Sequence, residues 1–187
     1  MKSLIIIISS LFATTVFAQN IDTEGFGFGG PEFMHTHIAG QNAFIVGGKG
    51  GKLINENFAI GGGGYALANS IDKLNNSVNG TNVDLAYGGV VFSYFTKPIS
   101  DFNFSGSVLI GGGGLSYKTD DKLETEDEFF VVVPSIDVQY QTFDFMRLSA
   151  GIGYRFINGI DLKGIKDSDL NGLNLKLSFM FGNYIED

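Results

Sequence analysis

The segment from Leu173 to Phe181 has an apolar residue at every second position. Successive side chains of a strand point to opposite faces, whereas a helix repeats every 3.6 residues, so this alternation predicts a β-strand. One face of the expected strand carries Leu173, Leu175, Leu177, Phe179 and Phe181, and the other carries Asn174, Lys176 and Ser178 together with Met180. The chain must therefore provide an apolar environment for one face of this strand and a polar environment for the other.

The same pattern recurs along the chain and predicts about eight strands. They are expected at residues 24–38, 42–54, 58–68, 83–95, 102–117, 129–141, 145–157 and 173–181. Short connections at 55–57, 97–101 and 142–144 alternate with long ones at 69–80, 118–128 and 158–171, and only the turn at 39–41 breaks this rule. An even number of antiparallel strands with short turns at one end and long loops at the other is typical of transmembrane barrels.

Glycine marks the middle of several expected strands, with 27 glycines in 187 residues. A reversal centred on Glu56 predicts that Gly48 faces Gly64 and that Gly51 faces Gly61. Glycine in a strand costs roughly 0.5–1 kcal/mol relative to alanine, so we expect these glycines to serve strong curvature or close backbone approach, and inward ones to make room for bulky neighbours. A phosphate-binding loop is not favoured, because the segment 47–53 lacks the spacing and the Ser/Thr of a P-loop.

We predict an all-β fold in which the sheet closes into an antiparallel up-and-down barrel of the transmembrane type. The polar faces of the last two expected strands contain small or isolated polar residues, which suit a narrow lumen, while the apolar faces suit lipid. Aromatic residues gather near the two strand ends, as in a membrane girdle. Phe58, Tyr94, Phe95, Phe102, Phe104, Tyr140, Phe143, Phe145, Phe179 and Phe181 lie toward the short turns, and Tyr65, Tyr117, Phe129, Tyr154 and Phe156 lie toward the long loops.

Residues 1–18 have the pattern of a secretory signal peptide: Lys2, an apolar run, and the small-residue exit Val16-Phe17-Ala18. We expect cleavage after Ala18 and a single barrel domain at 19–187. Without Lys2, the 12 Lys and Arg become 11 against 20 Asp and Glu, a formal charge of 11 − 20 = −9. Such an acidic chain is not expected to bind nucleic acid. It has no cysteine, which excludes disulfides and thiolate metal sites.

The strand number, the turn asymmetry and the closing strand 173–181 resemble the small outer-membrane β-barrel proteins, close in architecture to the OmpX-like and OmpA-barrel-like group. The resemblance covers residues 24–182 and implies a protein embedded in the lipid bilayer of the cell outer membrane. One feature departs from the pattern. Many such proteins end on an aromatic residue, whereas six residues follow Phe181 here.

Charged residues on the expected inner faces form the candidate site. We predict a lumenal network of ion pairs among Asp84, Asp137, Arg147, Arg155 and Lys176, because charges hidden from water must be paired. Its purely structural interpretation is that eight strands leave an interior filled by side chains. No catalytic residue, cofactor or metal site is expected. The acidic stretch 119–128 matches no EF-hand order and is interpreted as a solvated surface loop.

The favoured function is a non-enzymatic outer-membrane protein with a structural, surface-interaction or minor small-solute role, whose loops face outward. A soluble periplasmic lipocalin-like barrel that binds an apolar ligand is the alternative, and it requires the odd-numbered side chains of 173–181 to point inward. A lipid-modifying outer-membrane enzyme is a third hypothesis. It needs a nucleophile and a base, yet the only histidines, His35 and His37, share one strand face and are better interpreted as strand or rim residues.

Overall fold

A computed structural model of the chain describes residues 27–71, 83–97, 101–118, 124–161 and 165–182. The expected signal peptide lies outside the described residues. The strands are β1 Gly27–Ile38, β2 Gln41–Leu53, β3 Phe58–Leu67, β4 Val83–Phe95, β5 Phe102–Lys118, β6 Glu124–Phe143, β7 Met146–Asn158 and β8 Gly172–Gly182, with a four-residue helix, α3, at Asp167–Leu170. Within these residues, no helix has the length and hydropathy needed to cross a membrane.

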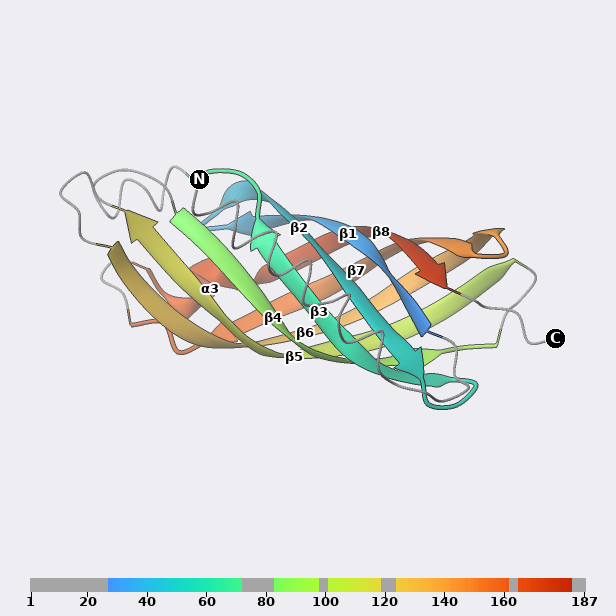
Figure 1. The fold of residues 1–187 in the computed structure, drawn as a ribbon. Helices are drawn as coiled ribbons and strands as arrows, with labels where there is room; N and C mark the ends of the chain where they lie inside the picture. Colours follow the sequence, from blue (N-terminus) through green and yellow to red (C-terminus); the bar gives the residue numbers. More distant parts are fainter. Residues whose placement is uncertain (1–26, 72–82, 98–100, 119–123, 162–164, 183–187) are drawn as a thin grey trace.

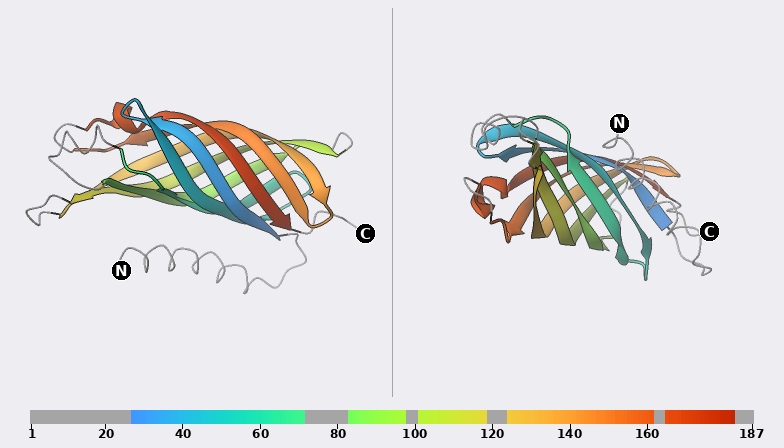
Figure 2. Two further views of the ribbon diagram at one scale, coloured as in Figure 1. Left: turned by 90° about the horizontal axis from the view of Figure 1, so that it is seen from above. Right: turned by 60° about the vertical axis from the view of Figure 1, so that its left-hand side comes forward.

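Each strand pairs antiparallel with the next, and β1 also pairs with β8, so the sheet closes into a barrel. The closing register places Phe33 opposite Leu177 and Thr36 opposite Asn174. The eight strands run obliquely around the barrel, and α3 lies at the end that carries the long loops (Figures 1 and 2). The predicted all-β, closed, up-and-down architecture is confirmed.

The pairing of β2 with β3 has the register expected from the reversal at Glu56. Gly48 lies opposite Gly64 and Gly51 lies opposite Gly61, as predicted. The β5–β6 hairpin differs from expectation, because β6 begins at Glu124 rather than at Phe129 and pairs with β5 as far as Lys118. The alternation of apolar and polar residues is lost in this acidic segment, yet the backbone ladder continues. The expected loop at 119–128 is therefore strand from Glu124 onward.

The β1–β2 hairpin is closed by a two-residue turn at the long-loop end. Ala39 and Gly40 both have positive φ, at 51° and 76°, which is the backbone conformation of the type I′ turn that joins twisted strands most directly. The Ala39 amide also donates a hydrogen bond to the Asp169 carbonyl at 2.7 Å, which ties the turn to α3. At the long-loop end, the β1–β2 hairpin therefore extends less far from the barrel than the β5–β6 hairpin, whose strands have 17 and 20 residues.

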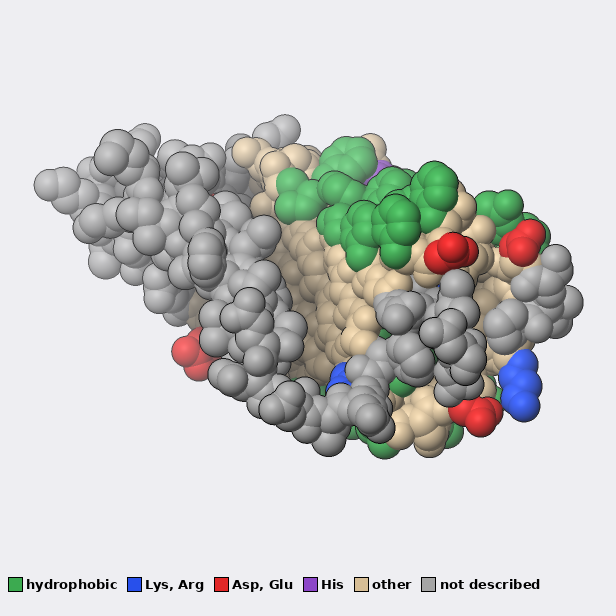
Figure 3. All heavy atoms as spheres, turned by 45° about the vertical axis from the view of Figure 1, so that its right-hand side comes forward, with side chains coloured by type: hydrophobic (Ala, Val, Ile, Leu, Met, Phe, Trp, Pro, Cys, Tyr) green, Lys and Arg blue, Asp and Glu red, His purple; other side chains and the backbone are tan. Residues whose placement is uncertain are grey.

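The outer surface is apolar, as predicted. Leu173 and Leu175 are 54% and 52% exposed, and Ile136 in β6 is 63% exposed, whereas Asn174, Lys176 and Ser178 are buried. Hydrophobic side chains form a broad patch on the face shown in Figure 3. The odd-numbered residues of 173–181 thus point away from the lumen. The lipocalin-like alternative required them to point inward, so its requirement is not met.

The lumen is divided into two halves, and the prediction of a small polar interior is wrong for one of them. The short-turn half contains buried polar residues, namely Ser93, Asn103, Ser105, Gln139 and Ser149. The long-loop half is filled by an apolar cluster that includes Ile38, Ile45, Leu85, Leu115, Phe129 and Val131, with Ile165 and Leu170 packed from the β7–β8 connection. An interior that water does not enter can be packed with apolar side chains like an ordinary protein core.

The aromatic band at the short-turn end is confirmed for Phe58, Tyr94 and Phe102, which are exposed on the outer face, and Phe145 is exposed in the β6–β7 turn. Phe95 was predicted for the same band but is half-buried, with its ring centroid 5.6 Å from that of Phe28 on β1. At the long-loop end the exposed aromatics include Tyr154 and Phe156. Two other members of the expected long-loop band, Tyr65 and Phe129, are buried in the lumen instead. The side chain of Tyr117 lies outside the described residues. Position near a strand end therefore did not distinguish a girdle residue from a residue of the apolar core.

Inward glycines make room for these two buried rings. A Cβ at Gly113 would lie 2.5 Å from Phe129 Cζ, and a Cβ at Gly47 would lie 2.5 Å from Tyr65 Cδ1. Each glycine sits directly opposite its aromatic residue on the neighbouring strand. Gly64 faces outward, and a Cβ there would have no heavy atom within 4 Å. The predicted space for a bulky neighbour therefore applies at Gly47 and Gly113. At Gly61 and Gly111 a Cβ would instead meet the backbone of the neighbouring strand, so close backbone approach is the reason for glycine there.

Candidate functional site

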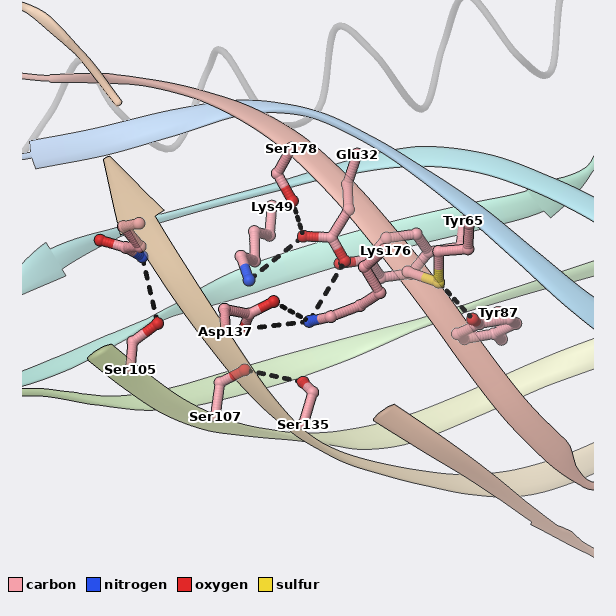
Figure 4. A network of polar contacts seen from close by, with 12 residues as sticks. Glu32, Lys49, Tyr65, Tyr87, Ser105, Ser107, Ser135, Asp137, Lys176 and Ser178 are labelled. Atoms are coloured by element: carbon pink, nitrogen blue, oxygen red, sulfur yellow. Dashed lines mark hydrogen bonds and ion pairs between the residues drawn. The ribbon is translucent and has the colours of Figure 1, made fainter. Parts of the chain in front are cut away.

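Glu32 of β1 is the centre of a polar network inside the barrel (Figure 4). The network lies where the polar and apolar halves of the lumen meet. Lys49 Nζ of β2 lies 3.1 Å from Glu32 Oε2, and the Ser178 hydroxyl of β8 donates to the same oxygen at 2.9 Å. The Tyr65 hydroxyl of β3 donates to Glu32 Oε1 at 3.3 Å. Three further strands thus bring polar groups to one carboxylate.

Lys176 of β8 connects Glu32 to the other side of the lumen. Its Nζ lies 3.8 Å from Glu32 Oε1 and 3.0 Å from Asp137 Oδ1, and it donates a hydrogen bond to Asp137 Oδ2 at 3.2 Å. Asp137 belongs to β6, so the chain of contacts crosses the barrel from β1 to β6 by way of β8. Figure 4 shows the two lysines pointing toward the two carboxylates.

The network is buried and balanced in charge. The side chains of Glu32, Asp137 and Lys176 are at most 2% exposed, and that of Lys49 is 10% exposed. Two carboxylates face two ammonium groups, which meets the requirement that charges removed from water be paired. Breaking such a buried pair typically costs about 3–5 kcal/mol, because the remaining charge stays buried.

A cavity of about 20 Å³ adjoins the network. Its lining includes Glu32, Lys49 and Lys176 on one side and Ser107, Ser135 and Val133 on the other. A volume of ~10–15 Å³ is enough for one water molecule. The centre of the lumen thus has space for a single water and not for a drug-sized apolar ligand, which needs ~300 Å³ or more.

Hydroxyl and amide groups extend the polar contacts along β5 and β6. The Ser107 and Ser135 hydroxyls lie 3.0 Å apart, and Gln139 Nε2 donates to Ser105 Oγ at 3.1 Å. These side chains bond across directly paired strands, so four of the polar groups of the short-turn half satisfy one another, whereas Asn103 Oδ1 in the same half has no hydrogen-bond partner among the described residues.

The structure brings together two of the five residues predicted for the network, Asp137 and Lys176. Arg147 lies at the short-turn end, where its Nε donates to Gln141 Oε1 at 2.8 Å. Arg155 is fully buried in the long-loop half, where its Nε donates to the Leu170 carbonyl at 2.8 Å and its Nη1 donates to Asn174 Oδ1 at 3.2 Å. These contacts connect Arg155 to the segment that follows β7 rather than to the central carboxylates.

Asp84 requires a correction, because it is exposed and does not face the lumen. Its neighbour Leu85 is buried at 2% exposure, and Tyr87 is buried at 4%. The assignment rested on the rule that polar residues point inward. That rule reverses toward the long-loop end of β4, where the lumen is apolar.

Glu32 and Lys49 are the network residues that sequence reasoning missed. Lys49 lies among glycines, which have no preference for either face, and Glu32 follows Pro31 in a strand with weak alternation. The register of β2 against β3 was available from the turn at Glu56, but register alone does not say which face is inside. The missing signal was Phe33, because an apolar outer face at that position places Glu32 inward.

The histidines lie away from this network, on the outer face of β1. The ring centroids of His35 and His37 are 5.6 Å apart, and that of His35 is 5.2 Å from Phe44 of β2. His35 is partly exposed and His37 is exposed. Both are rim residues near the β1–β2 turn.

No protein-family model matches the chain, and no curated protein matches it. Several solved barrel structures resemble it. Neisserial surface protein A matches with a TM-score of 0.61 at 14% identity, over 84% of this chain and 96% of that one. The N-terminal β-barrel domain of Pseudomonas aeruginosa OprF matches with a TM-score of 0.57 at 9% identity, over 85% and 99%. Ail, the attachment invasion locus protein of Yersinia pestis, matches with a TM-score of 0.51 at 11% identity, over 86% and 99%.

At these identities the comparisons establish the fold. The fold is that of the small eight-stranded outer-membrane barrels, which confirms the architectural resemblance drawn from the sequence.

Proposed function

We propose that this chain is an outer-membrane barrel with a structural or surface-interaction role, exported by the signal peptide at residues 1–18 and without enzymatic activity. The observation that carries the proposal is the outer surface. Large apolar side chains such as Phe33, Ile136 and Leu175 are 45–63% exposed on strands that close completely on themselves. Soluble monomers rarely present such a continuous apolar surface, whereas a transmembrane barrel requires one.

The filled lumen supports a structural or surface role over solute passage. The apolar cluster occupies the long-loop half, the ion-pair network occupies the centre, and the central cavity has room for one water. The network braces the barrel from within. In the described residues both histidines face outward, away from Glu32 and Asp137, and this separation supports the absence of an acid–base catalytic centre.

The long-loop end is the part of the protein that we expect to meet the outside. The β5–β6 hairpin continues the ladder to the Lys118–Glu124 pair, far beyond the low β1–β2 turn. Exposed Glu128 and exposed Asp161 give the described part of this rim a negative character. A partner of the rim would therefore be recognised at the β5–β6 side first.

Membrane placement is tested by a charge on the outer face. We expect Ile136→Arg, in the middle of β6, to cost about 2–4 kcal/mol of folding free energy in lipid vesicles, because the bilayer centre does not solvate the guanidinium. The control is Ser168→Arg at an exposed position of α3, which should fold like the parent. Folding is followed by the heat-dependent shift in gel migration and by urea titration. A product found in the soluble periplasm, or an Ile136→Arg variant that is as stable as the control, would contradict the proposal.

A further inference from the structure

His35 and His37 lie two positions apart on β1, so both imidazoles project from the outer face of the same strand. Their ring centroids are 5.6 Å apart, with an angle of 76° between the ring planes. They are the only histidines of the chain. Sequence reasoning interpreted them as strand or rim residues and expected no metal site, yet this spacing holds two nitrogen ligands side by side.

The distance between the rings fits two imidazoles that share one metal ion. A metal–nitrogen bond of about 2.0–2.1 Å places the ring centroid roughly 3.2 Å from the metal, so two rings on one ion have centroids at most ~6.4 Å apart. A tetrahedral angle at the metal would place them roughly 5.2 Å apart. The observed 5.6 Å lies within this limit. A small rotation of either side chain is enough to reach the tetrahedral arrangement.

Both imidazoles are available to a ligand from outside the barrel. Among the described residues, neither ring hydrogen-bonds to another protein group. His37 is exposed and His35 is half-buried, and the pair lies close to the two-residue turn that begins at Ala39, at the end that carries the long loops. A hydrated metal ion therefore reaches the pair without entering the lumen.

The surroundings of the pair select the kind of ion. His35 lies opposite Phe44 on β2 and Leu175 on β8. His37 lies opposite Asn42 on β2, which is also exposed on the outer face. None of these three neighbours is a carboxylate, the main ligand of Ca²⁺ in proteins, whereas imidazole suits Cu²⁺, Ni²⁺ and Zn²⁺.

We propose that His35 and His37 together bind one divalent transition-metal ion at the outer rim of the barrel. Each imidazole supplies one nitrogen, and water and the Asn42 side-chain oxygen complete the coordination shell. Cu²⁺ binds most tightly in the divalent series, as the Irving–Williams order requires of nitrogen ligands. The acidic chain, with a formal charge of −8, favours the approach of a cation.

The test uses Cu²⁺ as the probe and the full barrel, without a polyhistidine tag, refolded into phosphatidylcholine vesicles. Pulsed electron paramagnetic resonance counts the imidazoles bound to Cu²⁺, and a copper titration gives the affinity. We expect one Cu²⁺ per chain with two imidazoles. His35→Gln and His37→Gln should each leave one imidazole and weaken binding about tenfold or more, because the second ligand is no longer held beside the first.

The matched control keeps two histidines but separates them. The double variant His35→Gln/Phe130→His moves one histidine to an exposed position of β6, a strand that does not pair with β1. It should bind Cu²⁺ no more tightly than His35→Gln alone. Zn²⁺ should displace Cu²⁺ from the parent at far lower concentration than Ca²⁺ does. The heat-dependent shift in gel migration checks that each variant is folded, and the single variants serve if the double one is not.

Three results would overturn the proposal: a single imidazole on Cu²⁺ in the parent, equal affinity of the parent and the control with separated histidines, or binding that survives loss of both histidines. The last result would place the copper at the amino terminus or at the lipid. Because the site lies on β1 alone and the titration can be repeated in detergent micelles, loss of copper binding would not bear on membrane placement.

Discussion

The two halves of the lumen are both filled by side chains, one half by polar side chains and the other by apolar ones. In the short-turn half, residues such as Ser105 and Gln139 fill the space and bond to one another, whereas in the long-loop half Leu115, Phe129 and Val131 fill it by apolar packing. The side chains of both halves are buried, at 7% and 5% exposure for Ser105 and Gln139 and at 0% for Leu115 and Val131. The comparison teaches that the lipid outside fixes only the polarity of the outer face, while the inner face can be polar or apolar provided that it is fully packed or fully hydrogen-bonded.

The boundary between the halves should be the most sensitive place in the barrel. Glu32→Ala leaves Lys49 and Lys176 with one carboxylate, Asp137, so we expect a loss of about 3–5 kcal/mol in the free energy of unfolding. Urea unfolding in vesicles measures the loss. Asp84→Asn, which alters an exposed acid, should change stability by less than about 0.5 kcal/mol. Equal effects at the two positions would mean that the network does not brace the barrel.

The halves themselves can be compared by truncating one buried side chain in each. Leu115→Ala in the apolar half should cost about 2–5 kcal/mol, since it leaves a cavity in a packed core. Ser105→Ala in the polar half should cost about 1 kcal/mol, because it removes one hydrogen bond from Gln139. The same urea titration tests both. A larger loss for Ser105→Ala than for Leu115→Ala would reverse the interpretation of which half is packed as a core.

Glycine substitutions sharpen the contrast between the inner and outer faces. Gly113→Ala should destabilise the barrel by about 1–3 kcal/mol, because the added methyl group meets both the Ala86 carbonyl oxygen and the Phe129 ring. Gly64→Ala should be neutral, or stabilising by up to about 1 kcal/mol, because its Cβ points into open space. Thermal or urea unfolding of the two single variants provides the comparison. Tolerance of Gly113→Ala would show that the backbone at Ala86 and the Phe129 ring can both move.

Most of the fold could be predicted from the sequence because the outer face has a strict period of two. The closing strand at 173–181, the β2–β3 register and the full extent of β4 followed from that period and from turn chemistry. The ends of β6 could not be predicted. Its acidic segment carries no alternation, and strand pairing there depends on the neighbouring strand.

The site was predicted less completely than the fold. Asp137 and Lys176 lie between apolar residues that face outward, so the inward direction of their side chains could be predicted. The directions of Lys49, which lies among glycines, and of Glu32, which follows Pro31, could not be predicted. The other errors, at Asp84, Tyr65 and Phe129, have a single cause. In the long-loop half of the barrel, the polarity of a side chain does not indicate whether it faces the lumen or the outside.

The hydrogen bond from Ser178 to Glu32 joins two strands that are 146 positions apart in the chain. Glu32 therefore remains without two of its partners, Lys176 and Ser178, until β8 docks against β1. Contacts between such distant positions form late in folding, because loop closure must precede them. Interactions absent from the folding transition state act mainly on the rate of unfolding. We therefore expect the network at Glu32 to slow the separation of β1 from β8 when the barrel unfolds.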